Sequence, residues 1–148
     1  MDRFGFNKAL NEIKSQATPN FLLGAIKLEQ EEMKENFESE SANGDPWKEL
    51  VYRDVPPPIL DLEGELKSEA IENLPKIEGN KAVLIIDPID SRGKGYAEFH
   101  QQDGSGETAT KGTGDYGKNV KREFMTQSPE LDEKQKNLLI NEINKVFK

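Results

Sequence analysis

The strongest constraint in this sequence is how little of it can form a β-sheet. Residues 82–87 read Ala-Val-Leu-Ile-Ile-Asp, and such a β-branched, nearly continuous apolar run favours a strand. Pro88 stops the run, because proline has no N–H to donate to a sheet ladder. After a turn at 89–95, residues 96–100 are expected to return as an antiparallel partner, and residues 120–125 are a further candidate strand. Only a small sheet can be built from these segments.

Four other segments carry apolar residues three or four positions apart, which is the spacing of one face of an α-helix. The sequence predicts helices over residues 4–17, 20–38, 61–74 and 129–147. Thr18-Pro19-Asn20 is expected to break the chain between the first two, because proline is tolerated in the first turn of a helix but not within it.

The spacing also predicts which side of each helix is buried. In the helix at 20–38, the apolar stripe is Leu22, Ile26, Met33 and Phe37, and the acidic outer side is Glu29, Glu31, Glu32 and Glu35. The helix at 61–74 has Asp61 as its N-cap and buries Leu62, Leu66 and Ala70. The last helix has Ser128 as its N-cap and Pro129 in first position, and it buries Leu131, Leu139, Ile143 and either Val146 or Phe147.

The remaining segments have the composition of turns and loops. Asn43-Gly44 is a strong turn dipeptide that closes a polar loop. The only Trp, Trp47, precedes a run of three prolines at 56–58, which favours extended geometry over a helix or a central strand. Residues 101–119 mix glycines with Ser, Thr, Lys and Asp and have little to bury, so we expect a flexible loop.

These elements predict an α+β fold in which helices pack on a small antiparallel β-sheet, with a long Gly-rich loop. We expect residues 1–148 to form a single domain, with residues 1–19 as an N-terminal helix and break and residues 101–119 as the loop. A doubly wound α/β fold is excluded because only one strand–helix alternation is available.

Composition removes several functional classes. The 148 residues include no Cys and one His, so a thiolate metal site and a cysteine nucleophile are excluded. No apolar run approaches the ~20 residues of a membrane span, and Met1-Asp2-Arg3-Phe4 does not begin like a secretory leader. The formal net charge of −8 opposes binding to nucleic-acid phosphates. Such a surface either keeps a small domain in solution or lets DNA slide past without being retained.

The Gly-rich segment invites comparison with a phosphate-binding loop. In a Walker loop the Lys follows a Gly, precedes Ser or Thr, and leads into a helix. Here Lys111 follows Thr110 and precedes Gly112, and no helix is predicted after it. We therefore expect no nucleotide site.

Asp87 and Asp90 follow the predicted strand and, with Glu98 or His100 from the next one, could bind a divalent cation. The same carboxylates are also ordinary turn residues that accept backbone N–H bonds. His100 lacks a nucleophile in a suitable context and is expected to bond to backbone or to a partner chain. Trp47 either fills the edge of the core or anchors an interface.

Five landmarks follow one another along the chain. They are Phe37 at the end of a helix; Gly44-Asp45-Pro46-Trp47 followed by Leu50; the helical segment Ile59-Leu60-Asp61-Leu62-Glu63-Gly64-Glu65-Leu66-Lys67-Ser68; Tyr96-Ala97-Glu98-Phe99-His100-Gln101 followed by Gly104; and Arg122-Glu123-Phe124 before an acidic helix. In this order and spacing, over residues 21–147, they resemble the phage virion morphogenesis, or tail-completion, family. This sequence departs from that family in the segment after the Trp, which has few charges, and around Arg122, where the usual prolines are missing.

The resemblance implies a non-enzymatic bacteriophage structural protein that completes the tail and supports head–tail joining at the neck. It implies a location in the virion after assembly in the host cytoplasm, in several copies about the tail axis. The implied partners are other neck and tail proteins, such as the tail tube, the terminator and the head–tail connector. No cofactor, metal, membrane or specific nucleic acid is expected. The residues expected to contact partners are Trp47, Tyr96, His100, Gln101, Gly104, Lys111, Arg122 and Phe124.

Three alternatives remain open at this point. Within the same class, the protein could be the tail terminator that caps the tail tube. A small metal-dependent hydrolase would use Asp87, Asp90 and His100. A monomeric adaptor unrelated to virions would have no place in phage particles.

Overall fold

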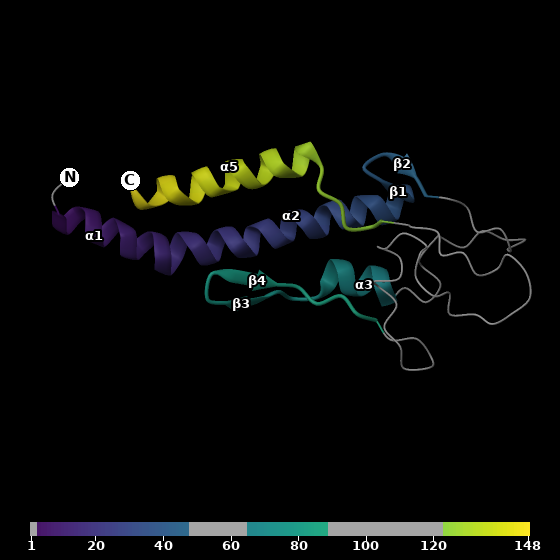
Figure 1. The fold of residues 1–148 in the computed structure, drawn as a ribbon, viewed down its shortest axis with the longest axis horizontal. Helices are drawn as coiled ribbons and strands as arrows, with labels where there is room; N and C mark the ends of the chain where they lie inside the picture. The colour runs from purple at the N-terminus through teal and green to yellow at the C-terminus, as the bar shows by residue number, and fades with distance from the viewer. Residues whose placement is uncertain (1–2, 48–64, 89–122) are drawn as a thin grey trace, which may run out of the picture. The chain divides into compact units, whose positions relative to one another are not determined.

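The structure, a computed structural model, describes residues 3–47, 65–88 and 123–148 (Figure 1). The elements in chain order are α1 (Arg3–Glu12), a π-helical turn (Ile13–Ala17), α2 (Thr18–Ser39), β1 (Ser41–Ala42), β2 (Asp45–Pro46), α3 (Glu65–Glu72), β3 (Lys76–Glu78), β4 (Lys81–Val83) and α5 (Pro129–Val146). Helices are combined with two small two-stranded antiparallel sheets, so the predicted α+β class is confirmed. Among the described residues, no helix is both long and apolar enough to cross a membrane.

The chain divides into two compact units. The first comprises residues 1–30, 74–84 and 127–148, and the second comprises residues 31–73 and 85–126. The helix α2 contributes its first part to one unit and its last part to the other.

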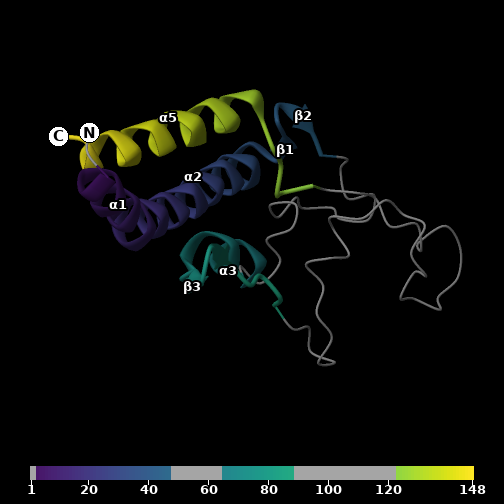
Figure 2. The same cartoon turned by 60° about the vertical axis from the view of Figure 1, so that its left-hand side comes forward.

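The predicted break at Thr18-Pro19-Asn20 is wrong, because the helical path continues through it. The Thr18 N–H donates to the Ile13 carbonyl, five residues back, which widens this turn into a π-helix. The Thr18 hydroxyl donates to the same carbonyl at 3.0 Å. A widened turn accommodates Pro19, which has no N–H and whose ring would crowd a regular α-helix. Figure 2 shows the path changing direction between α1 and α2.

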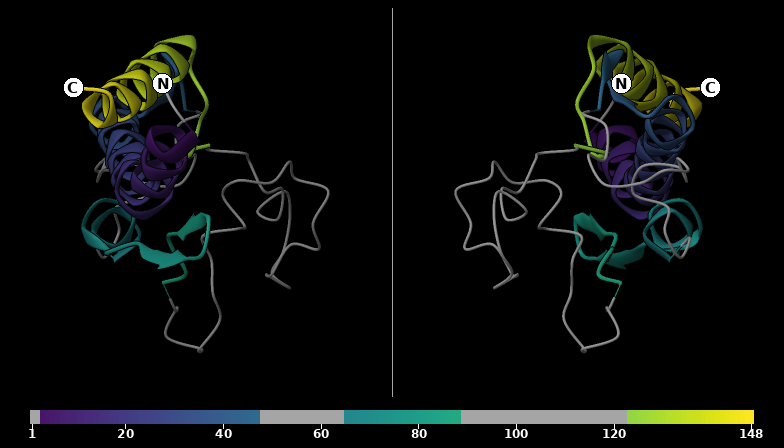
Figure 3. Two further views of the ribbon diagram at one scale, coloured as in Figure 1. Left: turned by 90° about the vertical axis from the view of Figure 1, so that its left-hand side faces the viewer. Right: turned by 90° about the vertical axis from the view of Figure 1, so that its right-hand side faces the viewer.

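In the first unit, α5 packs antiparallel to the first part of α2, and it lies along one side of α2 in each view (Figures 1 and 3). Asn20 and Gly24 of α2 meet Glu142 and Leu138 of α5 respectively, so position numbers fall on one helix as they rise on the other. The predicted cap of α5 is confirmed, since the Ser128 Oγ accepts from Leu131 N at 3.0 Å and Pro129 is the first helical residue.

The buried face of α5 differs from the one predicted. Leu131 is buried as expected, Ile143 is half-buried, and of the pair Val146 and Phe147 the first is half-buried and the second exposed. Leu139 is exposed. The inward positions are instead filled by Leu131, Gln135, Leu138 and Glu142. These four residues are spaced three or four apart, and two of them are polar because α2 supplies polar partners.

The strand predicted over residues 82–87 is shorter, and it pairs with a segment that the sequence analysis did not identify as a strand. The strand β4 covers only Lys81–Val83, and its partner is β3, Lys76–Glu78, in the register Ile77 to Ala82. Gly79 has a φ of 61° in the turn between them, where a glycine is favoured. A two-residue connection closes a hairpin at low entropic cost, which favours this local pairing. The expected partner at 96–100 lies outside the described residues.

In the second unit, Asn43-Gly44 forms the predicted turn. It joins β1 and β2, which pair Ala42 with Asp45. Both turn residues have positive φ, 51° at Asn43 and 87° at Gly44, which is the signature of a type I′ hairpin turn.

The predicted third helix is present as α3, and its residues Leu66 and Ala70 are buried as expected. Its predicted start, with Asp61 as the N-cap and Leu62 in the buried face, lies outside the described residues. The described part of the strand predicted at 120–125 is not a strand, since residues 123–125 are irregular.

The predicted stripe of α2 is buried at Ile26, Met33 and Phe37, and Leu22 is half-buried. On the predicted acidic side, Glu31 and Glu35 are exposed. The other two members of that side, Glu29 and Glu32, are half-buried and accept hydrogen bonds.

Candidate functional site

Three aromatic rings from distant parts of the chain pack together in the second unit. Phe37, near the end of α2, contacts Trp47 edge-on, with ring centroids 5.8 Å apart and an interplanar angle of 83°. Phe37 also contacts Phe124, with ring centroids 5.3 Å apart and planes tilted by 31°. All three side chains are buried: Phe37 is 4% exposed, Trp47 6% and Phe124 0%. We call these three residues the aromatic cluster; its geometry is typical of stabilising aromatic pairs.

The β1–β2 hairpin places Trp47 in this cluster. The tight turn at Asn43-Gly44 reverses the chain, and the Trp47 N–H donates to the Glu40 carbonyl at 2.7 Å. The indole Nε1–H donates to the Glu123 carbonyl at 3.0 Å, one residue before Phe124. The polar edge of the buried indole is therefore satisfied by the same segment that its ring packs against.

Asn36, one residue before Phe37, holds the same two segments by its side chain. It is buried, and its Nδ2 donates to the Phe124 carbonyl at 3.0 Å and to the Thr126 hydroxyl at 2.9 Å. Its Oδ1 accepts from the Asn43 N–H at 3.3 Å. Both amide donors and the amide oxygen are thus used, which fixes the orientation of the amide.

The hydrogen-bond chain continues from Thr126 to an acidic side chain of α2. The Thr126 hydroxyl donates to Glu32 Oε1 at 3.2 Å. Since Asn36 and Glu32 lie one turn apart on α2, both bond to the same threonine. Residues 123–126 are thus tied to the last turns of α2 through backbone and side chain.

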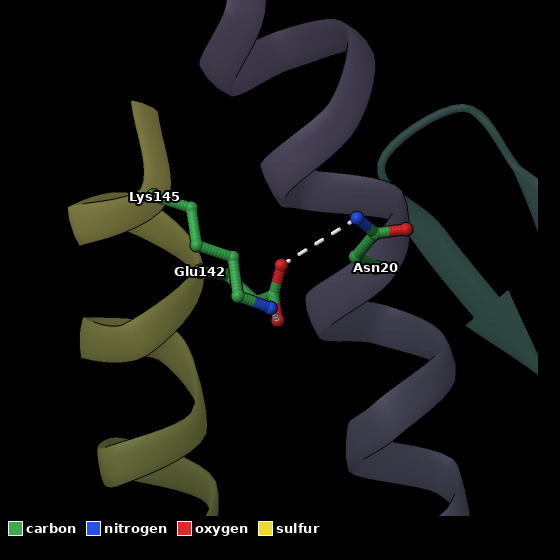
Figure 4. A network of polar contacts seen from close by, with 3 residues as sticks. All are labelled: Asn20, Glu142 and Lys145. Carbon is green, nitrogen blue, oxygen red and sulfur yellow. Dashed lines mark hydrogen bonds and ion pairs between the residues drawn. The ribbon is translucent and has the colours of Figure 1, made fainter. Parts of the chain in front are cut away.

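A second polar network lies in the first unit, between α5 and the start of α2 (Figure 4). Glu142 is buried, accepts from Asn20 Nδ2 at 3.5 Å and forms an ion pair with Lys145 on its own helix. About two turns toward the N-terminus of α5, Gln135 Nε2 donates to Glu29 Oε1 at 3.1 Å. The contact of Leu138 with Gly24 lies between these two polar contacts. Buried carboxylates need such partners, and this network sets which face of α5 turns inward.

Beside this network a shallow, open hollow runs along the last turns of α5. Its described lining residues, all on or just after α5, are Leu138, Asn141, Glu142, Asn144, Lys145, Phe147 and Lys148. It has no opposing wall in the described residues, so it does not enclose a small molecule.

Two of the predicted partner-contacting residues are described, and both are core residues. Trp47 and Phe124 are buried in the aromatic cluster, so burial gives no support to a direct contact of either ring with another protein. The interpretation of Trp47 as a residue that fills the core is the one its contacts favour. The other predicted residues lie outside the described residues: Tyr96, His100, Gln101, Gly104, Lys111 and Arg122.

Of the predicted cation-binding residues only Asp87 is described, since Asp90 and His100 fall outside. Asp87 is exposed, and its backbone N–H donates to Glu69 Oε2 at 2.9 Å. This carboxylate-to-backbone bond at a segment end is ordinary loop chemistry. Across residues 3–47, 65–88 and 123–148, no group of three or more His, Asp and Glu side chains is arranged to hold a metal ion.

Sequence reasoning missed Asn36, Thr126 and Glu142. Each is a polar residue within or beside an apolar pattern, and such residues are normally assigned to the surface. The acceptors of the Asn36 amide group lie 88 and 90 residues away, so no local pattern identifies them. Glu142 had one available signal, because it occupies a position that continues the spacing of Leu131 and Leu138.

Compared with known proteins, the chain matches no family model, no curated protein and no solved structure. The likeness to the tail-completion family therefore depends on the sequence landmarks alone.

Proposed function

We propose that this protein is a non-enzymatic bacteriophage assembly protein that completes the tail and supports head–tail joining at the neck. The observation that carries the proposal is the aromatic cluster. Three landmarks of the tail-completion pattern are the Phe that ends the long helix, the Trp of Gly-x-Pro-Trp, and the Phe of Arg-x-Phe. In this chain they are Phe37, Trp47 and Phe124, and their rings pack on one another.

The residues of these motifs lie far apart in the sequence and are in contact in the structure. Trp47 and Glu123 are 76 positions apart, yet the indole donates to that backbone carbonyl. Gly44, a motif residue between Phe37 and Trp47, is part of the tight turn that reverses the chain between β1 and β2. The contact among these three landmarks supports the proposal that they form one set.

An assembly role also suits residues 123–126, which are hydrogen-bonded to Asn36 and Trp47. Residues 123–126 connect the described core to Arg122, which the resemblance places at a contact with a neighbouring protein. Asn36 and Trp47 hold residues 123–126 by hydrogen bonds. Arginine forms charge-assisted hydrogen bonds with acidic groups, which suits a contact with a neighbouring protein. Tyr96, His100, Gln101, Gly104 and Lys111 complete the proposed contact set.

The proposed partners are the tail tube, the terminator and the head–tail connector, and the proposed location is the virion neck. Several copies would surround the path of the DNA. A formal net charge of −8 suits a surface that DNA passes without being retained.

The test is electron microscopy of lysates from a phage that lacks this gene. The proposal predicts full heads beside separate, complete tails, and joined particles when the wild-type protein is supplied during infection. Arg122→Ala is expected to restore joining poorly, whereas Lys8→Ala, a matched loss of a basic side chain at an exposed position of α1, restores it fully.

Other outcomes discriminate among the alternatives. Tails of abnormal length would indicate a terminator instead. Normal, infectious particles in the absence of the protein would contradict the proposal.

A further inference from the structure

The turn of the β1–β2 hairpin carries an asparagine followed directly by a glycine, Asn43-Gly44, and both residues are exposed. The backbone N–H of Asn43 donates to Asn36 Oδ1 at 3.3 Å, whereas the side-chain amide of Asn43 forms no hydrogen bond within the described part of the chain. Apart from the adjoining residues, no atom lies within 4 Å of the place where a Cβ would stand on Gly44. The side-chain amide of Asn43 and the backbone nitrogen of Gly44 are therefore both accessible.

These two groups can react with each other and with water without an enzyme. When a base takes the proton of the Gly44 N–H, the nitrogen can attack Cγ of Asn43. A bond between this nitrogen and Cγ forms, the Cγ–Nδ2 bond breaks, and ammonia leaves with a proton from the solvent. The product is a five-membered cyclic imide. Glycine favours the attack because no side chain shields its nitrogen.

Water then opens the imide ring at one of its two carbonyl carbons. Addition at Cγ gives aspartate. Addition at the backbone carbonyl of position 43 gives isoaspartate, in which the main chain runs through the former side chain. In both cases a neutral amide has become a carboxylate, and the other product is ammonia.

The hairpin turn opposes this reaction as long as it is closed. Asn43 and Gly44 have φ values of 51° and 87°, which is the signature of a type I′ turn. The first of the two residues in such a turn has a ψ of about 30°, which sets the Gly44 nitrogen nearly opposite to the Asn43 Cβ across the Cα–C bond. Ring closure needs both on the same side. The required rotation of ψ breaks the pairing of Ala42 with Asp45, so the hairpin must open first.

We propose that Asn43 is a site of spontaneous deamidation that is reached through transient opening of the β1–β2 hairpin. The strands have two residues each, and a hairpin of this size is marginally stable by itself. Its closed form is also held by the bond from the Trp47 N–H to the Glu40 carbonyl and by the burial of Trp47. Local opening of such an element costs less free energy than unfolding of the whole chain.

Conversion to isoaspartate should keep the hairpin from closing as before. The longer main chain of isoaspartate does not fit the two-residue turn between Ala42 and Asp45, and its new carboxylate adds a negative charge beside Asp45. The hairpin places Trp47 against Phe37 and the Glu123 carbonyl, so the aromatic cluster should loosen after conversion. This inference does not depend on a virion function, and its failure would leave the function proposed above untouched.

The test is incubation of the folded full-length chain at slightly alkaline pH, followed by proteolytic digestion and mass spectrometry at intervals. Asn43 should gain the mass that separates an acid from an amide, and chromatography should show isoaspartate as the main product. Asn80 is the internal control. It is exposed in the β3–β4 turn but is followed by Lys81, whose side chain shields the backbone nitrogen, so it should stay intact while Asn43 converts.

A second measurement tests whether opening of the hairpin limits the rate. The chain unfolded in guanidinium chloride gives the unprotected rate, which should exceed the rate in the folded protein. Trp47→Phe removes the hydrogen bond from Nε1 and should accelerate conversion of the folded protein about tenfold. Phe6→Ala, at an exposed aromatic residue of α1, should leave the rate unchanged.

The fluorescence of Trp47 reports the effect on the aromatic cluster. Emission of the wild-type protein should shift to the red as Asn43 converts. Asn43→Gly keeps a pair of residues that suits a type I′ turn but has no amide to lose, so its emission should stay constant over the same period. Circular dichroism verifies that the helices of each variant are intact.

Three results would overturn the proposal. These are an Asn43 that stays intact in the folded protein while the unfolded chain converts, equal conversion of Asn43 and Asn80, and an unchanged rate in folded Trp47→Phe. An emission spectrum that stays constant after conversion of Asn43 would contradict the predicted loosening of the aromatic cluster.

Discussion

Gly24 of α2 lies directly against Leu138 of α5. A Cβ atom built on Gly24 would come within 2.6 Å of Leu138 Cδ2, and within 3.4 Å of Leu138 Cδ1. The absence of a side chain at position 24 therefore allows the close approach of these two helices.

Replacing this glycine should have opposite effects in two backgrounds. Gly24→Ala gains about 1 kcal/mol of helix propensity, but it forces Leu138 to move at a cost of about 1–3 kcal/mol. We expect a net loss of about 1 kcal/mol in the free energy of unfolding, measured by urea denaturation. In a Leu138→Ala background the clash is absent, so the same change should stabilise by about 1 kcal/mol. Stabilisation in both backgrounds would contradict the described contact.

Two substitutions of Trp47 test the aromatic cluster, because they remove first its hydrogen bond and then its buried ring. Trp47→Phe keeps most of the ring but removes the bond from Nε1 to the Glu123 carbonyl, and it should cost about 1–2 kcal/mol. Trp47→Ala also loses the buried ring and should cost about 3–5 kcal/mol. Thermal unfolding followed by circular dichroism measures both. Phe6→Ala, at an exposed aromatic residue of α1, serves as the control and should change stability by less than about 0.5 kcal/mol.

Asn36 is predicted to tolerate no isosteric change. Asn36→Asp replaces two donors by a carboxylate oxygen that faces the Phe124 carbonyl and the Thr126 hydroxyl, in a buried site. Loss of these bonds and burial of a charge should cost about 2–4 kcal/mol at neutral pH. Equilibrium unfolding in urea gives the value. The same change at the exposed Asn7 of α1 should have little effect, and equal losses at both positions would exclude the hydrogen-bond chain.

Gly44 provides a test of the hairpin that delivers Trp47. Its φ is 87°, and open space surrounds the position where a Cβ would lie, so Gly44→Ala is strained only by its backbone. We expect a loss of about 1–2 kcal/mol. Trp47 is the only Trp of the chain, so its fluorescence emission reports the local effect directly. A red-shifted native spectrum in Gly44→Ala is expected if the strain loosens the hairpin, and an unchanged stability would argue against the described turn.

Local signals in the sequence predicted the ends and turns of elements well. Ser128-Pro129 begins α5, and Asn43-Gly44 closes a hairpin, because capping and positive φ are properties of a few adjacent residues. Pro19 misled the prediction, because a widened turn absorbed a residue that normally ends a helix. The hairpin at Gly79 was not predicted; its turn pairs β4 with β3, the segment just before it.

The choice of buried face needed information from outside each helix. In α5, Leu138, Leu139 and Ile140 are consecutive, so apolar spacing alone allows either side to face inward. The buried face of α5 is determined by residues of α2. These are Gly24 and the polar partners of Glu142 and Gln135. The aromatic cluster is of the same kind: its residues were visible in the sequence, but their contact depends on a fold that brings distant segments together.

We propose that this protein completes tails so that they can join heads. The most direct test is the infectivity of a lysate from a phage lacking the gene, titrated after purified wild-type protein is added without further protein synthesis. The account predicts that the titre rises by several orders of magnitude and that joined particles appear by electron microscopy. No rise with a folded protein, while separate heads and tails are present, would contradict the account.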